Sequence, residues 1–103
     1  GPRMARKGKL NPLLDGQMPV TIKTQSVVTF HSFLVGYEKV SKGDVLVKFY
    51  DDDKTPLYAK ASTDGYMVDQ MQLHKGDVVT EDTVVATLVP ALSPQKHETS
   101  AKA

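Results

Sequence analysis

The residue best placed for chemistry in this sequence is Lys54, which ends a run of acidic residues in a turn-forming segment. The segment reads Asp51-Asp52-Asp53-Lys54-Thr55-Pro56 and lies between two apolar runs, 45–49 and 57–61. Two such runs joined by a short polar segment are typical of a β-hairpin. An exposed hairpin presents the amine of Lys54 to other proteins, with no secondary structure in the way. A second interpretation is that these charges only keep the hairpin soluble and prevent aggregation through its edge.

Other reactive arrangements are missing from the sequence. His31, His74 and His97 show no His-x-His or His-x-x-x-His spacing, so we expect no metal site. The acidic run lacks the alternating carboxylates and distal glutamate of a calcium loop. There is no Gly-x-Ser-x-Gly turn, no glycine-rich phosphate loop and no cysteine. Because no acid, base and nucleophile converge, we expect neither an enzyme nor a small-molecule binding protein.

Composition limits the chain to one domain and narrows its partners. It has 103 residues, of which 40% are hydrophobic, and this allows a modest core. The 13 Lys and Arg residues nearly balance the 12 Asp and Glu residues, but residues 18–90 hold 7 basic and 10 acidic residues. An acidic centre argues against nucleic acid as a partner. No apolar stretch can span a bilayer, so we expect membrane contact only through a missing flanking segment.

The charge and composition divide the chain into three parts. Residues 1–17 are basic, contain scattered Gly and Pro, and are interpreted as a disordered linker. Their opening Gly1-Pro2 is typical of the remnant that a cleaved expression tag leaves. Residues 91–103 are small and polar, so we expect a disordered tail. The folded domain is therefore expected at 18–90.

The central region has the pattern of short β-strands. Its apolar segments are rich in β-branched and aromatic residues and are separated by turn-forming Gly, Asp, Lys and Pro. They lie at 20–24, 28–30, 45–49, 57–61, 66–68 and 84–89. No window shows the apolar stripe of a helix. We therefore predict an all-β fold, built as a small sandwich or barrel.

A weak internal repeat relates two parts of this region. Residues 34–49 align with residues 73–88 at a constant offset of 39 without a gap, and six apolar positions coincide. Each copy contains an apolar residue, a polar turn, a valine, four turn-forming residues and a strand. We predict two half-sheets related by a pseudo-twofold axis, which pack together because neither alone can bury its apolar face.

The two copies resemble the biotinyl/lipoyl-like domain, also called the barrel-sandwich hybrid, whose half-motifs read Gly-Asp-x-Val-x-x-Gly-Asp-x-Leu. The matching positions are Val40, Gly43, Asp44 and Leu46 in the first copy and Gly76, Asp77 and Val79 in the second. Tyr37-Glu38 and Asp82-Thr83 stand where the family usually has Gly-Asp. Asp64-Gly65-Tyr66 is similar to the opening of the family's second half. The resemblance implies structural turns at Gly43, Asp44, Asp64, Gly65, Gly76 and Asp77.

One branch of this family, the membrane-fusion adaptors of efflux and secretion systems, uses the fold without a modified lysine. Their second half is similar to Asp64-Gly65, Gly76–Val79 and Leu88-Val89-Pro90 here. This likeness implies a non-catalytic module that needs no cofactor and contacts protein partners within a larger, extracytoplasmic, membrane-associated assembly. The surfaces it would use are the sheet edges and the hairpin residues Asp51, Asp52, Asp53, Lys54, Thr55 and Pro56. The helical hairpin usual in adaptors is replaced by a short turn.

Lipoyl carriers are the alternative branch. They hold an acylated lysine in an Asp-Lys pair at the hairpin tip, which implies covalent lipoyl on Lys54, beside Asp53, in a cytoplasmic multi-enzyme complex. The spacing from Lys54 to Gly65 is similar to that of carriers. The arm from Gly43 to Lys54 is one residue longer, which moves the lysine off the tip or requires a bulge. Pro56 also lacks a backbone donor where the return strand should pair.

Overall fold

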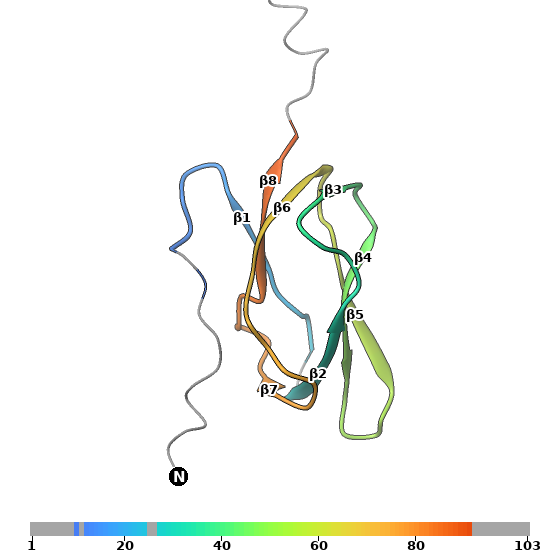
Figure 1. Cartoon of the computed structure of the whole chain (residues 1–103). Coiled ribbons are helices and arrows are strands. Elements are labelled where there is room, and N and C mark those ends of the chain that lie inside the picture. Colours follow the sequence, from blue (N-terminus) through green and yellow to red (C-terminus); the bar gives the residue numbers. More distant parts are fainter. Residues whose placement is uncertain (1–9, 11, 25–26, 92–103) are drawn as a thin grey trace, which may run out of the picture.

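Eight short strands and no helix make up residues 10, 12–24 and 27–91, the part of the chain that the computed structural model describes (Figure 1). The strands are β1 (Met18–Val20), β2 (Val28–Phe33), β3 (Lys39–Val40), β4 (Val45–Tyr50), β5 (Pro56–Lys60), β6 (Gly65–Gln70), β7 (Val78–Val79) and β8 (Ala86–Pro90). Within these residues no helix is long and apolar enough to cross a membrane. Most of the predicted linker, and the predicted tail from residue 92, lie outside the described residues.

The strands form two antiparallel sheets of four strands each, which confirms the predicted all-β class. One sheet has the order β1-β8-β6-β3, and the other has the order β5-β4-β2-β7. Figure 1 shows β1, β6 and β8 in one layer and β4 and β5 in a second layer beside it. Each sheet has one apolar face, and these faces must meet to leave water.

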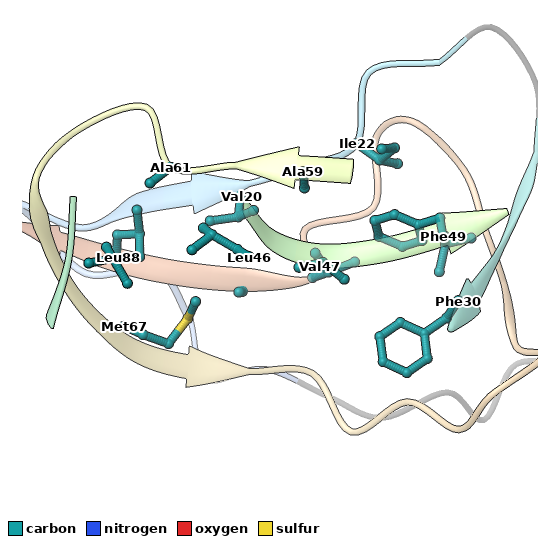
Figure 2. Close-up of a cluster of buried hydrophobic side chains, with 14 of the residues drawn as sticks. Val20, Ile22, Phe30, Leu46, Val47, Phe49, Ala59, Ala61, Met67 and Leu88 are labelled. Atoms are coloured by element: carbon teal, nitrogen blue, oxygen red, sulfur yellow. The ribbon is translucent and has the colours of Figure 1, made fainter. Parts of the chain in front are cut away.

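The core lies between the two sheets and takes side chains from both (Figure 2). Phe49 of β4 is the largest fully buried side chain, and its ring meets the Phe30 ring edge-on with centroids 6.1 Å apart. Met67 and Leu88 are buried on the sheet opposite. Burying a side chain of this size stabilises a fold by about 2 kcal/mol. Packing between the sheets, rather than either sheet alone, therefore holds the domain together.

The order and pairing of the strands are the same in the two sheets, as the internal sequence repeat predicts. The strands β3 and β4 of the first copy correspond to β7 and β8 of the second, 39 residues later, and the two sheet orders match under the same correspondence. The registers agree as well, since Phe30 pairs with Phe49 and Met67 pairs with Leu88. Both β2 and β6 carry a register irregularity immediately after these pairs. The two sheets thus consist of equivalent strands in an equivalent order.

Each copy of the repeat contributes one strand to each sheet, which differs from the prediction of one half-sheet per copy. In the first copy β3 lies in one sheet and β4 in the other; in the second copy β7 and β8 are likewise divided. The four turn-forming residues after the valine, 41–44 in the first copy and 80–83 in the second, begin the passage of the chain from one sheet to the other. The two copies are therefore interleaved, and each sheet requires strands from both.

A β-bulge in the first copy explains why two consecutive residues, Leu46 and Val47, are buried where alternation predicts one. The register between β4 and β5 shifts at Leu46. At the equivalent place the Val85 amide donates to the Val20 carbonyl at 2.9 Å. An extra residue on one strand turns its side chain to the neighbouring face. Leu46 is fully buried for this reason, whereas Val85 begins a run of four buried residues, 85–88.

The strand boundaries differ from the sequence prediction at two kinds of place. Alternation over 20–24 predicts a strand, but β1 ends at Val20 because the chain then crosses to the other sheet; Ile22 stays buried at this crossing. The edge strands β3 and β7 have two residues each, too few for any alternation to show.

Candidate functional site

The β4–β5 hairpin ends in a tight turn whose central residues are Asp52 and Asp53. The Lys54 amide donates to the Asp51 carbonyl at 2.9 Å, and the Asp51 amide donates to the Thr55 carbonyl at 3.0 Å. Lys54 has a φ of 63°, the left-handed conformation that commonly follows such a turn. Asp52 and Asp53, and not the pair Asp53-Lys54, therefore occupy the tip, and Lys54 lies one position beyond the centre of the turn.

Asp51 organises this turn through its side chain. Its Oδ1 atom accepts hydrogen bonds from the amides of Asp53 at 2.8 Å and Thr55 at 2.9 Å. Aspartate commonly fixes turns by accepting from amides a few residues later in the chain. The role of Asp51 is therefore structural, whereas Asp52 and Asp53 are exposed and leave their carboxylates at the tip.

Lys54 is exposed beside the tip of the hairpin. A left-handed backbone is uncommon for any residue other than glycine, and glycine adopts it without steric cost. The chain therefore holds an amine at a position where glycine is the better backbone choice. Chemically, the site can present this amine to the active site of a second protein, and its acylation would attach a cofactor through an amide bond.

Pro56 causes no loss of sheet hydrogen bonding. Antiparallel pairs alternate between hydrogen-bonded and non-hydrogen-bonded, and the Asp51–Thr55 pair is of the first kind. The next pair, Tyr50 with Pro56, is therefore of the second kind, and the Pro56 nitrogen faces the open edge of β5. The missing donor lies outside the β4–β5 ladder, where proline instead obstructs unwanted pairing.

Three predicted turn glycines meet two different requirements. Gly43 and Gly76 have φ values of 92° and 96°, which glycine alone adopts freely. Gly65 is needed for space, because a β-carbon there would lie 3.0 Å from the Pro90 α-carbon and still closer to the Val89 carbonyl oxygen. Each glycine is thus explained by the backbone around it and needs no ligand.

The predicted turn aspartates accept hydrogen bonds from backbone amides. Asp44 and Asp77 each accept from the amide three positions earlier, at 2.8 Å. In the second copy Thr83 stands at the position equivalent to Asp44 and makes the equivalent hydrogen bond, since its Oγ1 atom accepts from the Thr80 amide at 3.2 Å. This explains how the second copy tolerates the departure from Gly-Asp at 82–83.

A further predicted turn residue, Asp64, links the loop before β6 to the turn before β4. Its Oδ1 atom accepts from the Lys42 amide at 2.8 Å. Beside it the Gly43 amide donates to the Ala61 carbonyl at 2.8 Å, and the Ala61 amide donates to the Asp44 carbonyl at 2.9 Å. The turn before β4 and the loop before β6 are therefore held together by backbone groups.

A cluster that the sequence analysis missed lies on β2 and β4 around Tyr50. The Lys48 Nζ atom lies 5.1 Å from the Tyr50 ring centroid, and the His31 ring meets the same ring edge-on at 5.5 Å. Hydrogen bonding to Tyr50 is the main cause that raises the pKa of Lys48. Partial burial, with Lys75 and Lys48 nearby, lowers the pKa of His31. The sequence signal for this cluster was that Lys48 and Tyr50 interrupt the buried positions of the run 45–50, so their side chains lie on the face away from the core.

A cleft of about 480 Å³ separates β1 from β5. Its lining residues are Pro19, Val20, Thr21, Lys23, Tyr58, Ala59, Lys60 and Ser62. Figure 2 shows β1 and β5 side by side at this edge of the molecule, with Val20 and Ala59 labelled on them. No local sequence pattern indicates this cleft, because its two walls lie about 39 residues apart in the chain.

The described residues include no cluster of three His, Cys, Asp or Glu side chains with the geometry of a metal site. His31 contacts Ser32 and Tyr50, and the nearest pair to a metal-like arrangement is His74 with Asp77, whose Nδ1 and Oδ2 atoms are 4.0 Å apart. His97 lies outside the described residues.

In comparisons with known proteins, the chain matches no family model, no curated protein and no solved structure.

Proposed function

We propose that this chain is a non-catalytic structural and protein-interaction module with a biotinyl/lipoyl-like, barrel-sandwich hybrid fold, belonging to a membrane transport or secretion adaptor. The observation that carries the proposal is the equivalence of strand order and register between the two copies. Interleaved copies that exchange strands between two sheets are what a barrel-sandwich hybrid requires. In this role the protein would contact partners through the β4–β5 hairpin and the open sheet edges.

The turn of the β4–β5 hairpin supports a role in contact rather than in carrying a cofactor. Lys54 follows the centre of the turn, and the two exposed carboxylates of Asp52 and Asp53 occupy the centre itself. A protein surface that meets this tip therefore meets negative charge first. The adaptor interpretation needs no modification at Lys54.

A lipoyl carrier is the second candidate, and one observation favours it. Lys54 keeps an exposed amine in a left-handed backbone position that glycine would satisfy better. Unfavourable backbone conformations persist where function requires them. On this interpretation the acyl-lysine would swing from the hairpin between the active sites of a cytoplasmic complex.

Intact-mass analysis after co-expression with lipoate ligases separates the two candidates. A gain of one lipoyl group that disappears in Lys54→Ala and persists in the control Lys60→Ala would establish the carrier. The adaptor proposal expects no gain with any ligase tested.

The adaptor proposal itself is tested with the full-length gene product. We expect it to copurify with an integral membrane transport component. Replacing Asp52 and Asp53 by Asn should weaken this copurification, whereas Asp15→Asn, an exposed carboxylate outside the hairpin, should not. Recovery of the full-length product entirely without membrane components would refute it.

A further inference from the structure

The strand β5 has one edge that no other strand of the described residues covers. It is the terminal strand of its sheet, paired only with β4. Hydrogen-bonded and non-hydrogen-bonded pairs alternate along β4 and β5, and two bonds show where the alternation begins and ends. The Asp51 amide donates to the Thr55 carbonyl at the turn, and the Ala61 amide donates to the Asp44 carbonyl at the other end. Between these two bonds, and with the bulge at Leu46, the residues Pro56, Tyr58 and Lys60 of β5 each form a non-hydrogen-bonded pair with β4. Their backbone groups point away from β4.

This open edge keeps donors at two of the three positions. Pro56 has no N–H, but the amides of Tyr58 and Lys60 face outwards, and in the described part of the chain neither donates to another loop. Antiparallel and parallel strands both pair through such outward amides and carbonyls. The edge of β5 can therefore accept one more strand, starting after Pro56.

The opposite wall of the cleft does not offer the same opportunity. β1 has three residues, and Val20 pairs with Ala86 and directs its carbonyl towards β8, where it accepts from the Val85 amide at 2.9 Å. Pro19 therefore occupies the outward-facing position and has no N–H to donate. A strand that enters the cleft can pair with β5 but not with β1, so the geometry selects one sheet for extension.

The charge of the cleft selects the chemistry of the added strand. Lys23 and Lys60 are exposed at the cleft, and none of the described residues that line it is acidic. Glu81 and Asp82 line a neighbouring hollow beyond Lys23. Glu81 and Asp82 thus offset the charge of Lys23 more than that of Lys60, so the cleft is most positive near Lys60. The central region of the chain is acidic overall.

We propose that an extended, acidic segment of a partner protein adds to β5 as a fifth strand and lies in the cleft between β5 and β1. Main-chain bonds to Tyr58 and Lys60 would give affinity, and carboxylates near Lys60 would give selectivity. This proposal rests on the proposed function as an interaction module, and it names the surface and the partner chemistry.

The test uses the full chain and a labelled synthetic peptide in which Glu alternates with Val over about eight residues. Fluorescence anisotropy should detect binding that weakens with salt. In the complex the amides of Tyr58 and Lys60 should exchange with solvent more slowly. A peptide with Lys in place of Glu should not bind. Absence of binding by the Glu peptide at low salt, or equal binding of both peptides, would overturn the proposal.

Tyr58→Pro removes an outward donor without removing a bond to β4, so the variant should fold and lose peptide affinity by roughly tenfold or more. Circular dichroism and thermal unfolding check its fold. Tyr58→Phe should bind as the parent does, and Lys60→Ala should bind less tightly than the control Lys42→Ala, which changes an exposed lysine outside the cleft. Unchanged binding by a folded Tyr58→Pro variant would refute strand addition.

The acidic hairpin of a second copy is the competing occupant. Sedimentation showing a self-association that Tyr58→Pro abolishes would overturn the proposal in favour of that occupant. A protein that copurifies with its membrane component but binds no acidic peptide would refute this inference and leave the proposed function standing.

Discussion

Gly65 of β6 and Val89 of β8 approach so closely that no β-carbon fits between them. An added β-carbon would overlap the Val89 carbonyl oxygen and lie 3.0 Å from the Pro90 α-carbon. The equivalent position in the other sheet is Val28, which pairs with Val79 as Gly65 pairs with Val40. A side chain fits at Val28 because the chain after β4 leaves the sheet into the hairpin turn.

Gly65→Ala should therefore destabilise the domain by about 2 kcal/mol or more, because backbone atoms of β8 cannot move without breaking the sheet. Chemical denaturation measures this difference. Gly36→Ala is the matched control, since its β-carbon would meet only a Glu38 side-chain oxygen at 3.9 Å. Equal stability of both variants would contradict the steric explanation.

Lys54→Gly should raise the free energy of unfolding by about 0.5–1 kcal/mol relative to Lys54→Ala, since only glycine adopts a φ of 63° without steric cost. Thermal unfolding of the two variants checks this without reference to any function of the amine. A larger stability for the alanine variant would mean that the turn does not have this conformation in solution.

Thr87 is the one buried polar side chain of the described core, and its Oγ1 atom has no hydrogen-bond partner. Thr87→Val keeps the shape and removes the unsatisfied hydroxyl, so it should stabilise the domain by about 1 kcal/mol. Thr29→Val is the control, because it deletes a hydroxyl that donates to the Tyr50 carbonyl at 3.3 Å. That variant should gain nothing, and a destabilised Thr87→Val protein would show that the hydroxyl is satisfied in solution.

His31 should titrate below its ordinary value of 6.5, because partial burial, Lys75 and Lys48 all disfavour its protonated form. Its folded pKa lies below its unfolded pKa, so the unfolded chain binds the proton first as pH falls. The contribution of His31 to stability is therefore present above pH 6.5 and declines as pH falls from there toward the folded pKa. NMR titration of the ring measures the folded pKa, and Lys75→Gln should raise it. A pKa at or above 6.5 would contradict this assignment.

The sequence was sufficient for the class of fold and for most of its strands, since the runs 45–49 and 57–61 show their pattern locally. It was insufficient where structure depends on distant backbone. The conformation of Lys54 follows from the hydrogen bonds that Asp51 accepts from the amides of Asp53 and Thr55. With these bonds Asp52 and Asp53 occupy the centre of the turn, and Lys54 follows it. The cleft depends on the approach of β1 to β5, which no local pattern describes.

The pairing of β1 with β8 also determines how the domain would respond to tension. Met18 begins β1 and pairs with Leu88, near the end of β8, so the chain enters and leaves the domain at the same end of one antiparallel pair (Figure 1). A pull on the two flanking segments would load these hydrogen bonds one after another instead of all together. The three-residue β1 should peel away at low force, whereas a pull between β1 and the β4–β5 hairpin would have to separate the packed sheets.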